Sequence, residues 1–106
     1  MGVINFRNHT LVYNKIYKFE SEGKCYFVKI RDGYMLSYKG LTEHFHYIIN
    51  IRTKKVYLKL GFPSSTIDWK ITLATNKEIV WFNDCIITDK FTYPPINHSI
   101  IDYIKF

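Results

Sequence analysis

Alanine is almost absent from this chain of 106 residues, in which Ala74 is the only one. Isoleucine occurs fifteen times, tyrosine nine times and phenylalanine eight times. Alanine is the strongest helix former, whereas β-branched and aromatic side chains favour a pleated, half-buried strand. The sequence therefore predicts an all-β protein, and its length suits one β-rich domain over residues 1–106 with a single core.

Alternation of apolar and polar residues predicts three hairpins, which join 24–31 to 34–39, 44–52 to 55–62, and 69–75 to 78–82. The first is centred on Asp32-Gly33, because Asp-Gly favours the two-residue type I′ turn. Its strands carry large apolar groups on both faces, so one of these faces is either a second inner surface or a binding surface. The other two hairpins are expected to turn at Thr53-Lys54 and Asn76-Lys77.

The hairpin around Thr53-Lys54 has the clearest pattern. Its predicted core face consists of Phe45, Tyr47, Ile49, Ile51, Val56, Leu58, Leu60 and Phe62. The opposite face is expected to meet solvent or a partner, and it consists of His44, His46, Ile48, Asn50, Arg52, Lys55, Tyr57 and Lys59. In the third hairpin the alternation places Trp69 and Phe82 inward and Lys70 and Trp81 outward.

The two ends of the chain carry weaker patterns. A first strand is expected over residues 10–20, closed by a turn at 21–23, so that successive strands pair as a meander. Ser99 and Asp102 resemble a capping box and predict a short C-terminal helix, although the isoleucines there also suit a strand. The predicted architecture is an antiparallel meander of about seven strands, forming a small sandwich or partly open barrel.

Catalytic patterns are weak throughout the sequence. His44 and His46 have a spacing compatible with zinc, but no Cys-x-x-Cys accompanies them, so we expect no metal. Most acidic residues fall at predicted turns or strand ends, and no glycine-rich loop is present, so we expect no cofactor and no enzyme activity. Cys25 and Cys85 are expected to be reduced thiols, with Cys25 the more accessible.

The chain carries a net charge of +6, with twelve lysines and three arginines. Phe, Tyr, Ile, Asn and Lys have AT-rich codons, so part of this charge can reflect base composition, for example in a mobile element. The charge still predicts attraction to anionic surfaces. The sequence has no long apolar run and no leader pattern, which predicts a cytoplasmic protein that does not enter a membrane.

Binding is the function class that these patterns favour, because aromatic anchors ringed by charge are typical of protein interfaces. The predicted partner-binding residues are Lys29, Arg31, Tyr34, Tyr38, His44, His46, Arg52, Lys55, Tyr57, Lys59, Lys70 and Trp81. The leading hypothesis is a small inhibitor, of the immunity-protein or phage anti-defence kind, that occludes an acidic or mixed-charge surface of a protein partner. The alternatives are a nucleic-acid-binding β-barrel and a metal-independent ribonuclease that uses residues such as His44, His46 and Tyr57.

Overall fold

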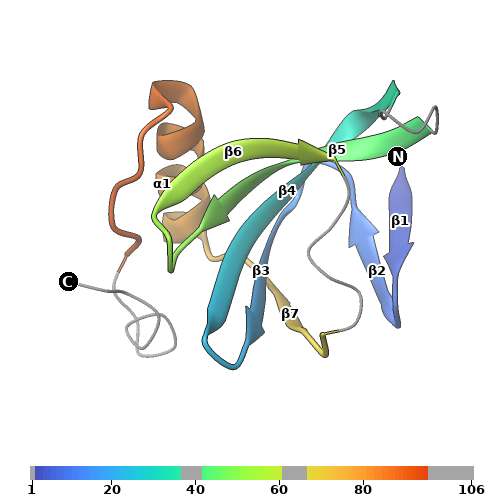
Figure 1. Ribbon diagram of the computed structural model, residues 1–106, viewed down its shortest axis with the longest axis horizontal. Helices are drawn as coiled ribbons and strands as arrows, with labels where there is room; N and C mark the ends of the chain where they lie inside the picture. The colour runs from blue at the N-terminus through green and yellow to red at the C-terminus, as the bar shows by residue number, and fades with distance from the viewer. Residues whose placement is uncertain (1, 37–41, 61–66, 96–106) are drawn as a thin grey trace.

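The computed structural model describes residues 2–36, 42–60 and 67–95. Its elements are β1 (Val3–Phe6), β2 (His9–Val12), β3 (Ile16–Ser21), β4 (Lys24–Leu36), β5 (Thr42–Asn50), β6 (Lys55–Leu60), β7 (Lys70–Leu73) and α1 (Asn76–Thr88). The strands form two antiparallel sheets, the hairpin β1–β2 and a five-stranded sheet of order β6-β5-β4-β3-β7 (Figure 1). The predicted all-β meander is confirmed, because β3 to β6 pair in sequence order, and the main sheet is open rather than closed into a barrel.

The main sheet is covered on both faces, at opposite ends. On one face α1 packs over a core formed by Ile16, Cys25, Phe27, Ile49 and Ile51 of the sheet with Trp81, Phe82 and Cys85 of the helix. On the other face the β1–β2 hairpin contributes Phe6 and Leu11 to a core with Tyr17, Phe19, Val28, Ile30, Ile48 and Trp69. Figure 1 shows the helix at one end of the strands and the hairpin at the other. Each face therefore has one covered end and one end that these elements leave open.

The predicted hairpin over residues 69–82 is wrong, because a helix begins where its turn was expected. Thr75 is the N-cap of α1: its hydroxyl accepts a hydrogen bond from the Glu78 N–H (3.2 Å), and Glu78 Oε1 accepts one from the Thr75 N–H (2.8 Å). This reciprocal capping box satisfies two backbone donors at the helix start. The alternation predicted over 78–82 does not match this helix, in which Glu78, Trp81 and Phe82 are buried and Val80, expected inward, is exposed.

The predicted turn at Asp32-Gly33 is also wrong. Strand β4 continues through these residues to Leu36, and it pairs with β5 both before and after them. The register between the two strands shifts between Ile30 and Tyr34, as at a β-bulge. A bulge and a tight turn can both use the conformational freedom of glycine, so an Asp-Gly pair does not distinguish one from the other.

The hairpin of β5 and β6 is confirmed with a change of register. Asn50 pairs with Lys55, so the turn spans residues 51–54 rather than the two residues predicted. Asn50 Oδ1 accepts hydrogen bonds from the N–H groups of Arg52 (3.0 Å) and Thr53 (3.3 Å), which closes the longer turn. Because the shift is two residues, residues 46–50 and 55–58 keep their predicted faces, and Phe62 of the predicted core face lies outside the described residues.

The predicted strand over residues 10–20 is divided in the structure. Strand β2 ends at Val12, and β3 begins at Ile16 after Asn14, which has a left-handed φ of 66°. The turn between β3 and β4 lies at 22–23 as predicted, with Gly23 at a φ of 71° that favours glycine. The helix predicted from Ser99 lies outside the described residues.

Candidate binding surfaces

Trp81 is a core residue, which corrects its expected position on an exposed strand face. Its side chain is 7% exposed, and its Nε1–H donates a hydrogen bond of 2.9 Å to the carbonyl oxygen of Thr92. Its ring packs edge-on against Phe27, with 5.0 Å between the ring centroids. Trp81 therefore joins α1, the sheet and the segment after the helix, and it presents almost no surface to a partner.

The sheet face expected to meet a partner around His46 and Tyr57 is largely internal. His46 is 0% exposed and Ile48 is 1% exposed, because this end of the face is where the β1–β2 hairpin core forms. Tyr57 is half-buried, and burial, with a smaller effect of neighbouring Tyr26, raises the pKa of its phenol above the usual value of 10. The expectation that His46 is exposed is therefore wrong, and Tyr57 presents only part of its ring.

Four predicted binding residues lie wholly or partly outside the structural description. Tyr38 lies outside the described residues. For Tyr34, His44 and Lys59 the structure gives the backbone position only: Tyr34 pairs with His44 between β4 and β5, and Lys59 pairs with His46 between β6 and β5. Their roles in binding stay predictions.

An open sheet surface, defined here as Lys29, Arg31, Tyr47 and Leu58, lies on the α1 face beyond the helix. Lys29 of β4 pairs with Tyr47 of β5, which in turn pairs with Leu58 of β6, so three adjacent strands present one row. The Arg31 guanidinium lies over the Tyr47 ring, with Cζ 5.4 Å from the centroid. Leu58 is 46% exposed, and the other three side chains are partly exposed. This surface combines positive charge with aromatic and aliphatic area.

A second group, the basic turn cluster, consists of Lys24, Arg52, Lys54, Lys55 and Tyr93. Arg52 Nη1 donates a hydrogen bond of 3.0 Å to the Gly23 carbonyl, which ties the β5–β6 turn to the β3–β4 turn. The Lys54 ammonium lies 5.2 Å from the centroid of the Tyr93 ring, a cation–π contact. The four basic residues are exposed. The predicted residues Arg52 and Lys55 thus belong to a different surface from Lys29 and Arg31.

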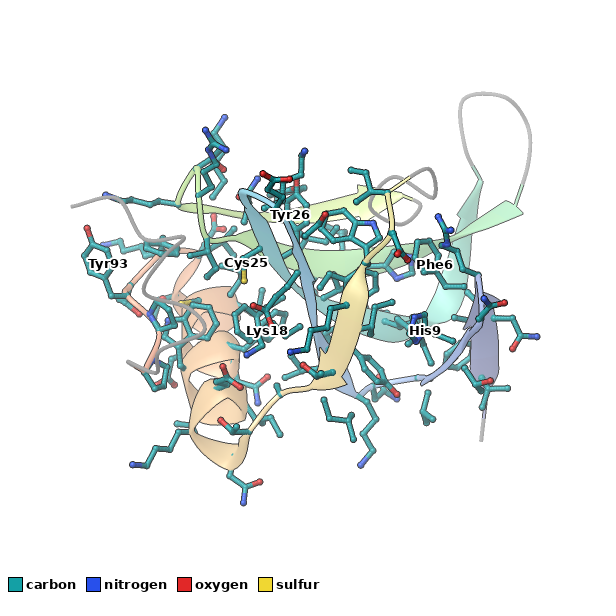
Figure 2. All side chains as sticks on the ribbon, turned by 90° about the horizontal axis from the view of Figure 1, so that it is seen from below. Phe6, His9, Lys18, Cys25, Tyr26 and Tyr93 are labelled. Atoms are coloured by element: carbon teal, nitrogen blue, oxygen red, sulfur yellow. The ribbon has the colours of Figure 1, made fainter. Side chains whose placement is uncertain are left out.

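The remaining predicted residue, Lys70, is exposed on the edge strand β7, where it pairs with Glu20 of β3. Glu20 belongs to a buried ionic cluster beneath the start of α1. The Lys18 ammonium lies 3.6 Å from Glu20 Oε1 and 3.9 Å from Glu78 Oε2. Figure 2 shows Lys18 at this end of the sheet, and Phe6 and His9 at the opposite end. Since Glu78 also caps the helix, we interpret the cluster as joining β3 to α1.

Both cysteines are free and buried, so the expectation that Cys25 is accessible is wrong. Cys25 pairs with Glu20 across β3 and β4 and is 0% exposed. Burial raises the pKa of its thiol to about 12, and the nearby Glu20 carboxylate acts in the same direction. A thiol with this pKa stays protonated at neutral pH, which makes it a poor nucleophile.

In residues 2–36, 42–60 and 67–95, no three His, Cys, Asp or Glu side chains form a group that could hold a metal ion. Within the same residues no helix has the length and apolar character needed to cross a bilayer. Among the surfaces that the described side chains offer, the open sheet surface and the basic turn cluster combine cationic with aromatic groups, which suits both of them to binding anions.

Sequence reasoning misassigned several of these residues. Tyr47 and Leu58 were both assigned to the core, whereas Tyr47 packs against the α1-side core and is only partly buried, and Leu58 is exposed. Lys54 was treated only as a turn residue, although its ammonium lies over the Tyr93 ring. Glu78 was placed in a strand, although the sequence Thr75-Asn76-Lys77-Glu78 matches the capping-box pattern and was a usable signal.

Comparison of the chain with protein-family models, with curated proteins and with solved structures finds no match.

Proposed function

We propose that this protein is a stoichiometric binding protein that occludes an acidic or mixed-charge surface on a larger protein partner, as small inhibitors of the immunity-protein or anti-defence kind do. The observation that carries the proposal is the open sheet surface. There Lys29, Tyr47 and Leu58 form one row across three strands, and Arg31 lies over the Tyr47 ring. The sheet already fixes the backbone of these residues, so little backbone conformational entropy is lost on binding.

The composition of the open sheet surface is that of an interface hot spot. Tyrosine and arginine are the residue types that most often dominate interface energies, and truncating such an anchor costs at least about 2 kcal/mol. Lys29 adds charge that steers an acidic partner toward the surface. Leu58, which is 46% exposed, adds apolar area at the border of the same row.

A nucleic-acid partner is the second candidate, and the basic turn cluster favours it. Exposed cations beside an accessible tyrosine ring are the elements of a single-strand binding site, in which bases stack on the ring. Tyr93 is 47% exposed and lies beside Lys54. We favour the protein partner because the open sheet surface includes exposed aliphatic area, which contributes more to protein interfaces than to phosphate contacts.

The test compares the wild-type chain with the double variant Lys29→Ala and Arg31→Ala in affinity capture from the native host. The matched control is Lys77→Ala with Lys90→Ala, which removes the same charge from exposed positions on and after α1. Each capture is divided into nuclease-treated and untreated halves. Circular dichroism confirms that all three chains are folded.

We expect one protein to be retained at fixed stoichiometry after nuclease by the wild type and the control. The Lys29/Arg31 variant should bind it at least about 30-fold more weakly, which corresponds to about 2 kcal/mol. Equal capture by both variants would place the interface elsewhere. Recovery of nucleic acid alone, lost on nuclease treatment, would replace the protein partner with the second candidate.

A further inference from the structure

Strand β6 forms one border of the main sheet. It is the last strand in the order β6-β5-β4-β3-β7, and in the described part of the chain no strand pairs with its outer side. Figure 1 shows it lying along the outer margin of the sheet. Strand β6 spans six residues, whereas the strand at the other border, β7, spans four. A long, unpaired edge presents backbone donors and acceptors to an added strand.

The side chains of β6 alternate between two different chemistries. Val56 and Leu58 lie on the α1 face, where Leu58 ends the row of the open sheet surface. Lys55 and Tyr57 lie on the other face, and Lys55 is an exposed member of the basic turn cluster. Among the side chains of β5 and β6 that the structure describes, none is acidic. An added strand would therefore meet apolar groups on one face and positive charge on the other.

We infer that β6 binds an extended segment of the protein partner by strand addition, and that this segment alternates acidic and apolar residues. Its backbone would pair with the open edge of β6, its apolar residues would extend the row through Leu58, and its carboxylates would lie opposite Lys55. The inference rests on the proposed function and specifies the partner's chemistry. It also explains how one partner can contact both the open sheet surface and the sheet border.

A second copy of this chain is a poorer occupant of the edge. Two antiparallel β6 strands related by a two-fold axis at Tyr57 would set Lys55 of one copy opposite Lys59 of the other. Like charges directly opposite each other destabilise a strand pair. Charge complementarity therefore favours an acidic segment over self-association.

The test uses a synthetic probe, an eight-residue peptide of alternating Glu and Val with blocked ends, added to the ¹⁵N-labelled full chain. We expect chemical-shift changes centred on the β6 amides and about tenfold slower hydrogen exchange for the outward-pointing ones. Lys55→Glu should weaken binding about fivefold through the lost cross-strand pair. The matched control Lys77→Glu, on α1, should bind like the wild type.

Three results would overturn the inference: no protection of β6 at millimolar peptide, equal binding of a peptide N-methylated at every valine, or a concentration-dependent dimer whose interface is β6. The N-methylated peptide keeps the side chains and loses the backbone N–H donors of its valines. This experiment is independent of the capture test. If the Lys29/Arg31 variant loses capture and β6 is not protected by the peptide, the proposed function stands and strand addition fails. If the peptide protects β6 and no protein is captured, strand addition stands and the proposed function fails.

Discussion

Replacing Trp81 by alanine tests whether this residue belongs to the core, as the structure places it, or is an exposed binding anchor, as the sequence predicted. The indole is 7% exposed, so almost all of its surface leaves water on folding. Burying an aromatic side chain removes about 150–250 Å² from water, which at about 25 cal/mol per Å² is about 4–6 kcal/mol as an upper limit. Measured truncations of buried aromatic residues cost about 3–5 kcal/mol. We expect Trp81→Ala to lower the free energy of unfolding by about 4 kcal/mol.

The variant Trp81→Phe separates the loss of free energy due to packing from the loss due to the indole hydrogen bond. Phenylalanine keeps most of the packing against Phe27 but loses the hydrogen bond to the Thr92 carbonyl oxygen. Thr92 is exposed, so water can replace the lost donor, and we expect a cost of about 1 kcal/mol for the bond plus a smaller packing loss.

The assay is urea unfolding followed by far-ultraviolet circular dichroism, with the midpoint and slope fitted for each chain. A domain of this size has about 5–15 kcal/mol of stability in total, so Trp81→Ala should be measurably less stable or partly unfolded at 25 °C. A loss below about 1 kcal/mol, together with loss of partner binding, would refute the buried position. It would restore Trp81 as an exposed anchor.

Two further variants test the helix start and the buried thiol. Thr75→Ala removes the hydroxyl that caps α1 and should lower the free energy of unfolding by about 1 kcal/mol, with Thr88→Ala at the other helix end as the comparison; an unchanged urea midpoint would contradict the capping box. Cys25 should not react with Ellman's reagent at pH 8 until the chain is unfolded, and rapid labelling of the folded chain would contradict its burial. Its pKa is raised from 9.0 to about 12, so the folded chain keeps the proton that the unfolded chain releases above pH 9. The stability of the wild type relative to Cys25→Ala should therefore be constant below pH 9 and fall by about 1.4 kcal/mol per pH unit from pH 9 toward 12, as measured by unfolding across that range.

The sequence predicted the residue types of the candidate binding surfaces better than it predicted which of those residues lie on the same surface. Lys29 and Arg31 are partly exposed on one sheet face, as an interface requires, while Arg52 and Lys55 belong to a separate turn cluster. His46 shows why the predicted split into a core face and an exposed face failed. Its face carries polar residues at both ends, and only the placement of the β1–β2 hairpin buries the residues between them. Periodicity gives the face on which a side chain lies but not which part of that face is covered.

The sequence by itself determined the β class, the meander of β3 to β6 and the faces of β5 and β6, because alternation and residue preference act over a few neighbouring residues. It also contained the capping box of α1 at Thr75, a local signal that alternation obscured. Tertiary structure decided the rest. Contacts distant in sequence kept β4 continuous through Asp32-Gly33, brought β7 beside β3, and placed helix and hairpin on opposite faces of the sheet. The total apolar area that the whole chain buries decides which end of each sheet face is left uncovered. No local sequence pattern contains that total.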